Sequence, residues 1–217
     1  MSLANDGFET PSLSLPPIDS GTSILLTGDD TEALQSVFSH LMAADDDERS
    51  IVLSTNNGGR AIQRNLNDVR TGAGSRASVL TCEGPAVGDD VQSVDDISDL
   101  TRLGMDFSTL VASAQQHSDR FRSGILLCST IASEVDDTRS LYRFLNSNFL
   151  TELRRGEGIG VCALDTSADI GADMNSTIKG LQTSFSAHVE VEKTDPSQAT
   201  LTVDGLDLNE ETVDVSL

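Results

Sequence analysis

The sequence predicts an α/β protein in which a doubly wound, mostly parallel sheet carries helices on both faces. Five short apolar runs have the length and composition of buried strands, and each is followed by a segment with helical periodicity. Near the end of the chain, two segments alternate polar and apolar residues around a proline turn, which predicts a C-terminal β hairpin. Strands that alternate with helices in this way form parallel sheets covered on both sides.

The first unit begins with the apolar run 23–27, which glycines bound, and continues into a helix over 31–43. Apolar residues in that helix recur three and four positions apart and so share one face. Further strands are expected at 50–54, 77–82, 124–128 and 160–164, further helices at 60–69, 104–121, 138–155 and 173–185, and the hairpin at 187–192 and 199–203.

The chain is interpreted as one domain over residues 21–205. Residues 1–20 contain three prolines and no sustained period, so they are expected to form a flexible lead-in. Residues 206–217 are expected to form an acidic C-terminal tail that is either frayed or an edge strand.

The charge of the chain is extreme, with 35 acidic residues against 14 basic ones and a net charge of −21. The acids occur in every segment, and only Lys179 and Lys193 are lysines, which favours adaptation of the whole surface to a high-salt cytoplasm. Since no basic stripe exists, phosphate-mediated nucleic-acid binding is not expected. The sequence also lacks an apolar run of membrane-spanning length and a signal peptide, so neither a membrane partner nor export is expected.

Metal and cofactor chemistry finds little support in the sequence. Cys82, Cys128 and Cys162 lie in apolar runs without paired spacing and are interpreted as small buried hydrophobes. The three histidines are interpreted as helix-face or strand residues, and the acidic run 45–48 as a solvated loop. We therefore expect no metal ion and no cofactor.

Several segments, in order, resemble the RecA-like ATPase core and, within it, the KaiC-like branch with its short halophile members. The similarity covers about residues 20–194 and depends on the order of the segments rather than on any single one. The segments are Ser23-Ile24-Leu25-Leu26-Thr27-Gly28, Arg64-Asn65-Leu66, Asp99-Leu100-Thr101-Arg102-Leu103-Gly104, Gly124-Ile125-Leu126-Leu127-Cys128-Ser129, and the closing strand 185–193. The resemblance implies a P-loop NTPase fold.

The phosphate loop that this resemblance implies is degenerate. A working loop, G-x-x-x-x-G-K-[ST], holds phosphate with backbone amides and a lysine, and holds magnesium with a hydroxyl. Here Gly28 is followed by Asp29, Asp30 and Thr31, without the second glycine, the lysine or the hydroxyl residue after it. Carboxylates would stand where phosphate belongs, or they serve simply to cap the helix, which is the interpretation we favour.

Two further catalytic parts of the resembled family are missing. Cys128 and Ser129 occupy the Walker B position, where an acid would hold magnesium, and a thiol is a poor ligand for a hard cation. Ser54-Thr55-Asn56-Asn57 stands where KaiC-like enzymes place glutamates that activate water. Asn56 and Asp165 could line the edge of a remnant pocket, since ligands bind at the carboxyl ends of parallel strands. Asp165 could equally be a solvated loop acid.

These features favour a non-catalytic RecA/KaiC-like domain that acts as a protein-binding or regulatory module, with signal transduction as the setting that family analogy suggests. Its partner would be a second copy of the chain or an active RecA/KaiC-like relative. The alternatives are an ATPase or other small-ligand enzyme with a rebuilt, non-standard pocket, and a purely structural assembly subunit. The chain is expected to be cytoplasmic.

The surface charge leads to a prediction about salt. Because the Debye length falls from ~10 Å at ~0.1 M to ~3 Å at ~1 M salt, screening should relieve the self-repulsion of the acidic surface. We expect the melting temperature to rise by several degrees between ~0.1 M and ~2 M potassium chloride. Chloride is used because sulfate stabilises proteins through exclusion as well. An unchanged melting temperature would contradict adaptation to salt.

Overall fold

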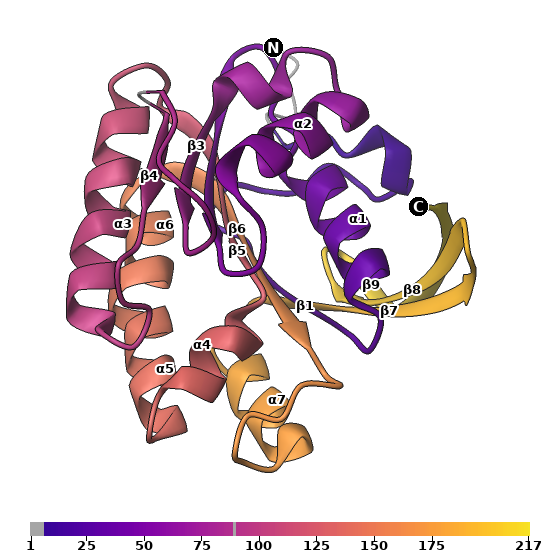
Figure 1. Cartoon of the computed structure of the whole chain (residues 1–217). Coiled ribbons are helices and arrows are strands. Elements are labelled where there is room, and N and C mark those ends of the chain that lie inside the picture. The colour runs from indigo at the N-terminus through magenta and orange to yellow at the C-terminus, as the bar shows by residue number, and fades with distance from the viewer. Residues whose placement is uncertain (1–6, 89) are drawn as a thin grey trace.

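The computed structural model describes residues 7–88 and 90–217, and its centre is one nine-stranded sheet (Figure 1). The strand order is β4-β3-β2-β5-β6-β1-β7-β8-β9. All neighbours from β4 to β7 are parallel, and β8 and β9 add to the sheet antiparallel, which confirms the predicted fold class. The strands are β1 (Ser23–Gly28), β2 (Glu48–Ser54), β3 (Ala77–Thr81), β4 (Val91–Ser93), β5 (Arg120–Leu126), β6 (Glu157–Asp165), β7 (Ala187–Asp195), β8 (Gln198–Gly205) and β9 (Leu208–Ser216).

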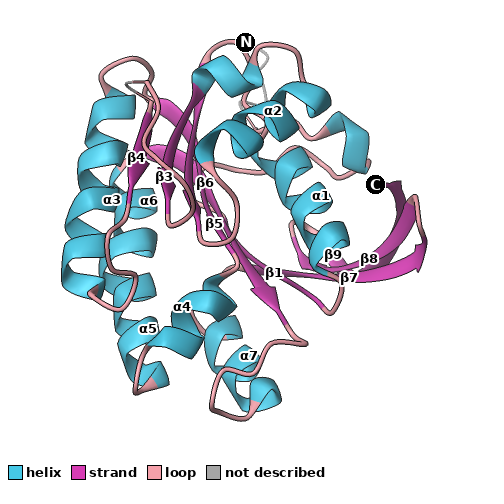
Figure 2. Ribbon diagram, viewed as in Figure 1, coloured by secondary structure: helices cyan, strands magenta, loops and turns pink. Residues whose placement is uncertain are grey.

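Helices cover the sheet in two layers (Figure 2). The apolar sides of α1 (Thr31–Met42) and α2 (Gly59–Val69) pack on one face. The other face is covered by α3 (Leu100–Gln115), α4 (Cys128–Glu134), α5 (Thr138–Phe144), α6 (Leu150–Arg155) and α7 (Met174–Gln182). Among the described residues, no helix is long and apolar enough to cross a membrane.

Some predicted element bounds are wrong, and local chemistry explains them. The helix expected at 104–121 begins at Leu100 because the Asp99 carboxylate accepts from the Arg102 amide at 3.0 Å, and Phe121 belongs to β5. The helix expected at 138–155 is interrupted by a π-helical turn, Leu145–Phe149. The short strand β4 and the helix α4 were not predicted, because β4 has only three residues and α4 begins inside an apolar run.

The described part of the amino-terminal lead-in packs against the domain. Phe8 and Ile18 exchange two backbone hydrogen bonds, at 2.8 and 3.0 Å, and both side chains are buried. Between them, Leu13 also enters the core, and Ser12 Oγ lies 2.6 Å from Nδ1 of His40 on α1. Residues 7–20 are thus packed against the domain in this structure, the flexibility of the lead-in stays a prediction, and residues 1–6 lie outside the described part.

A buried ion pair fixes this segment against the sheet. Arg122 on β5 is fully buried, and its Nε donates to Glu48 Oε2 at 2.6 Å. Its two terminal nitrogens donate to the carbonyl oxygens of Leu41, at 2.9 Å, and Glu9, at 3.0 Å. One guanidinium thus joins β5, β2, the end of α1 and the amino-terminal segment.

The carboxyl end extends the predicted hairpin by one strand. β9 pairs antiparallel with β8 from Gly205–Leu208 to Gln198–Ser216, so the expected acidic tail forms an edge strand rather than a frayed end. The domain consequently includes residues on both sides of the predicted 21–205 span.

The buried ion pair yields a stability prediction. Glu48→Gln leaves the Arg122 guanidinium buried without a counter-charge, so we expect the free energy of unfolding to fall by about 3–5 kcal/mol. Denaturant unfolding at fixed salt measures this change. The matched control is Glu192→Gln on the exposed side of β7, which should stay within ~0.5 kcal/mol of the wild type. Equal stability of the two variants would contradict the structural role of the pair.

Candidate functional site

The carboxyl ends of β1 and β6 form the place where this fold would bind a ligand. The two strands are parallel neighbours, with Gly28 opposite Asp165 in the register. The helix after β1 packs on one face of the sheet, and the helix after β6 packs on the other. The chain therefore leaves this point in opposite directions, and open α/β sheets bind ligands in the crevice at such a switch point.

Gly28 is required here by close packing. A β carbon at this position would lie 2.8 Å from the carbonyl oxygen of Val191 on β7 and 3.3 Å from the side chain of Leu34 on α1. The backbone of Gly28 also accepts a hydrogen bond from the Thr166 amide at 2.8 Å. The glycine that resembles the start of a phosphate loop thus lets β1, β7 and α1 converge.

The crevice between the two strand ends is bridged by the chain's own side chains. Thr31 Oγ1, at the first position of α1, donates to Asp165 Oδ2 at 2.7 Å. The other carboxylate oxygen accepts from the amide and the hydroxyl of Ser167, at 2.9 and 2.6 Å. Asp165 is only 8% exposed, and its carboxylate is used to join two loops.

The amino end of α1 holds a carboxylate of the protein itself. Asp30 caps the helix by accepting from the Ala33 amide at 2.8 Å. Lys193 Nζ, from β7, reaches Asp30 Oδ2 and Glu32 Oε2, each at 3.1 Å. The hydrogen bond from the Ala33 amide and the nearby Lys193 lower the pKa of Asp30. The carboxylates of Glu32 and Asp30 in turn raise the pKa of Lys193. A helix amide and a lysine amine, the groups that bind phosphate in a working loop, here bind Asp30.

The prediction that Cys128 ends the strand at the Walker B position is wrong. β5 ends at Leu126, Leu127 turns the chain with φ 64° and ψ 68°, and Cys128 starts α4 with its side chain buried. Ser129 follows it, and its hydroxyl accepts from the Asp165 amide at 3.3 Å. Ser129 therefore supports the loop after β6.

Hydroxyl groups occupy the end of β2, where the resembled enzymes place their glutamates. Ser54 and Thr81 both donate to the carbonyl oxygen of Asn57, at 2.8 and 2.9 Å. Thr55 donates to the carbonyl oxygens of Leu126 and Leu127, at 2.9 and 3.1 Å. These bonds fasten neighbouring strand ends and leave the hydroxyls engaged with backbone.

The predicted pocket-edge residues are not brought together. Asn56 is exposed, and its side-chain oxygen accepts from the Asn57 side chain at 2.9 Å. Asp165 is instead hydrogen-bonded to Thr31. Asp29 is exposed and lines a shallow depression of about 530 Å³ together with Asp30 and Lys193. Of the predicted positions, the structure joins Thr31, Ser129 and Asp165 in one network and places Asp30 beside it.

Lys193 was missed as a site residue by the sequence reasoning. It is one of only two lysines in the chain, and it sits in the strand that pairs with β1. The available signal was the rarity of lysine in this chain, since Lys193 stands at the end of the predicted closing strand 185–193. Its distance from the loop in sequence, about 160 residues, hid the contact.

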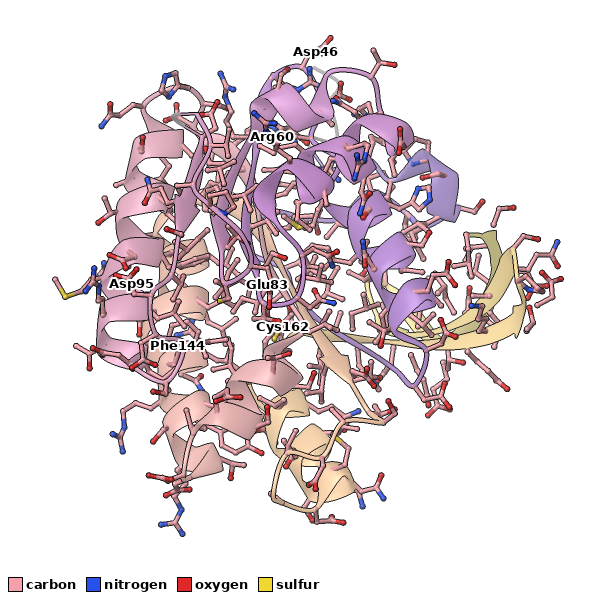
Figure 3. All side chains as sticks on the ribbon, viewed as in Figure 1. Asp46, Arg60, Glu83, Asp95, Phe144 and Cys162 are labelled. Carbon is pink, nitrogen blue, oxygen red and sulfur yellow. The ribbon has the colours of Figure 1, made fainter. Side chains whose placement is uncertain are left out.

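Burial shifts the pKa values of two thiols and of His188. Burial raises the pKa of Cys82 to about 11 and that of Cys162, which lies in the interior in Figure 3, well above its usual range. His188 is held between Thr27 Oγ1, at 2.8 Å, and Gln182 Nε2, at 2.9 Å, and burial lowers its pKa. Within residues 7–88 and 90–217, no group of three or more potential ligands could hold a metal ion.

Sequence comparison identifies a family for this chain. The profile of a family of unknown function, DUF7504, matches residues 21–191. The chain belongs to this family. A search of curated proteins found no match.

Solved structures place this DUF7504 member among archaeal proteins with the RecA/KaiC-like fold. A KaiC-like protein from Pyrococcus horikoshii is 12% identical with a TM-score of 0.58, and the alignment covers 91% of this chain and 90% of that one. The flagellar accessory protein FlaH from Methanocaldococcus jannaschii is 8% identical with a TM-score of 0.58, covering 91% and 86%. An uncharacterized P. horikoshii protein, solved with an unknown peptide, is 12% identical with a TM-score of 0.59, covering 87% and 86%. These likenesses establish the fold.

The bond between Thr31 and Asp165 gives the next prediction. Thr31→Val keeps the shape of the side chain but leaves Asp165 Oδ2 without this donor, so we expect the free energy of unfolding to fall by about 1–3 kcal/mol. Thr31→Ser keeps the hydroxyl and should recover most of that loss. Chemical denaturation of the three proteins at one salt concentration measures the effect. A valine variant as stable as the wild type would contradict a stabilising role for the bond between Thr31 and Asp165.

Proposed function

We propose that this DUF7504 protein is a non-catalytic RecA/KaiC-like domain that binds another protein or regulates one. The observation that carries the proposal is the occupation of the helix amino end at β1 by Asp30, which Lys193 and the Ala33 amide hold in place. A phosphate would have to displace this carboxylate from both partners. It would also meet Asp29 and Glu32 on the same turn.

The rest of the machinery for ATP hydrolysis points the same way. At the end of β5, where an acid would hold magnesium, Leu126 and Leu127 are followed by the buried Cys128 and by Ser129, whose hydroxyl accepts from the Asp165 amide. Ser54 and Thr55 stand at the end of β2, where a water-activating carboxylate is needed, and their hydroxyls donate to backbone carbonyl oxygens. Since phosphoryl transfer depends on positioning and charge neutralisation, the joint loss of lysine, metal ligand and base makes hydrolysis improbable.

The partner in this proposal is a protein: a second copy of the chain or a catalytically competent relative of the same fold. A fold neighbour that was solved with a peptide supports the idea that such a domain can hold a polypeptide. The acidic surface, with its net charge of −21, supports a setting in a high-salt cytoplasm and disfavours nucleic acid as a partner. A role in signal transduction rests on analogy with KaiC-like proteins.

A nucleotide titration tests the emptied site. We expect ATP with magnesium, added in ~2 M potassium chloride, to leave the melting temperature and the rate of phosphate release unchanged. A ligand at ~100 times its dissociation constant would add ~2.7 kcal/mol to the free energy of unfolding, which a thermal melt detects. Thr31→Val, which lacks the hydrogen bond to Asp165, is titrated in parallel to test whether that bond is what keeps nucleotide out. Saturable stabilisation of the wild type would overturn the proposal.

The same titration addresses the alternative of an enzyme with a rebuilt pocket. Phosphate release that Asp165→Asn abolishes, in a variant shown to remain folded, would support that enzyme and contradict the proposal. Light scattering and affinity capture in high salt, with the purified chain as bait, then separate a lone subunit, a homo-oligomer and a hetero-complex. A protein that stays monomeric and captures no partner would remove the binding role.

A further inference from the structure

A second hollow lies on the opposite side of the molecule from α1 and α2, at the start of α3 and the turn before α5. It has a volume of about 830 Å³, and residues of α3, the α4–α5 connection, α5 and the π-helical turn line it. The side chain of Phe144, labelled in Figure 3, belongs to its lining. We call it the α3–α5 groove, defined by Asp99, Leu100, Met105, Glu134, Asp136 and Phe144.

The apolar part of the groove is unusual for this surface. Met105 is 67% exposed and is the exposed large hydrophobic side chain of the described residues. Leu100 and Val135 are half-buried beside it, and Phe144 is buried at the base. An unbranched thioether side chain adapts to different partners at low cost, and apolar residues that remain exposed mark interaction sites.

α3 packs closely against the π-helical turn beside the groove. A β carbon at Gly104 would collide with the side-chain amide of Asn148, so a larger residue here would require that side chain to move. Asn148 itself lines the groove. π-helical turns inside α-helices occur frequently at functional sites because they displace side chains from the regular helix surface.

The rim of the groove is acidic. Asp99 and Asp137 cap α3 and α5 through the amides of Arg102, at 3.0 Å, and Arg139, at 2.9 Å. Glu134 and Asp136 lie between these caps, and within the described part of the chain neither has an ion-pair partner. Arg143 is the basic residue in the lining. Four carboxylates around an apolar floor complement a segment that is apolar on one side and basic on the other.

We propose that the α3–α5 groove binds a basic amphipathic segment of a protein partner, with Met105 contacting its apolar side and Glu134 and Asp136 contacting its lysine or arginine side chains. This inference names the docking surface for the protein-binding role and rests on that proposed function. The apolar contact supplies affinity that salt does not screen, and the carboxylates select against acidic segments.

A peptide titration tests the groove. The probe is a synthetic 18-residue peptide with leucines on one helical face and lysines on the other, and the comparison peptide has glutamate in place of each lysine. Methyl-labelled methionine reports the location, because Met105 is exposed whereas Met42 is buried and Met174 lies on α7. We expect the basic peptide to shift the Met105 methyl signal most and the acidic peptide to leave it unchanged.

Two variants separate groove binding from general attraction to an acidic protein. Met105→Lys and the pair Glu134→Lys with Asp136→Lys should each weaken binding about tenfold or more, measured by peptide anisotropy at ~0.5 M salt. The matched control is Glu190→Lys with Glu192→Lys, which makes the same charge change on exposed positions of β7. This control should stay within about twofold of the wild type. Circular dichroism confirms that each variant is folded.

The outcomes distinguish the groove from the emptied nucleotide site. No binding of the basic peptide, or equal weakening by the β7 control pair, overturns the groove while leaving the ATP result untouched. Conversely, stabilisation by ATP together with localised peptide binding overturns the non-catalytic assignment and leaves the groove in place. If the methyl signal of Met174 shifts more than that of Met105, the peptide binds elsewhere, and the inference is overturned.

Discussion

The structure depends on the buried pair formed by Arg122 and Glu48 at the amino ends of the parallel strands. Arg122 is completely enclosed, and its three nitrogens reach a carboxylate and two backbone carbonyls on separate segments. Enclosing a guanidinium is costly unless every donor is satisfied, so the pair favours the one arrangement that satisfies it. It sets β2 beside β5 and keeps the amino-terminal segment over the sheet. Because the pair is away from water, salt screens it much less than the surface charges.

Basic residues are scarce in this chain, and several of them neutralise the protein's own carboxylates at points where segments meet. Arg122 neutralises Glu48 at the amino ends of β5 and β2, and Lys193 on β7 neutralises Asp30 and Glu32 at the start of α1. Arg70 does the same for Asp45 after α1, at 2.5 Å. Many of the other acids face solvent, where screening decides their cost. Of these pairs, only that of Arg122 with Glu48 is enclosed on both sides, so it should respond weakly to salt, whereas the partly exposed pairs and the acidic surface should respond strongly.

Periodicity in the sequence was enough to predict most of the strand–helix order, because the five predicted parallel strands contain continuous apolar runs and the long helices have one apolar face. The capping role of Asp30 at the turn Gly28–Thr31 could also be predicted, since it is a local interaction. What could not be read were contacts between distant segments. The burial of Phe8 depends on guanidinium groups more than 100 residues away, with Arg120 lying 4.3 Å above its ring. The end of β5 depends on Leu127 adopting φ 64°, a conformation that leucine rarely takes and that composition does not signal. The link between Thr31 and Asp165 required the strand order.

The internal contacts at β1 also explain why a single substitution would not restore a phosphate loop. A lysine introduced at the start of α1 would still face Asp30, which is tethered to the helix amide and paired with Lys193. A carboxylate attached to the site competes at a high effective concentration, so a free phosphate would have to bind tightly to displace it. Thr31 and Asp165 would have to separate as well, although each is the other's partner across the strand ends. A working loop also needs several residues between strand and helix to surround the phosphates, whereas here only Asp29 and Asp30 lie between them. Backbone geometry and charge therefore both act against phosphate binding at this turn.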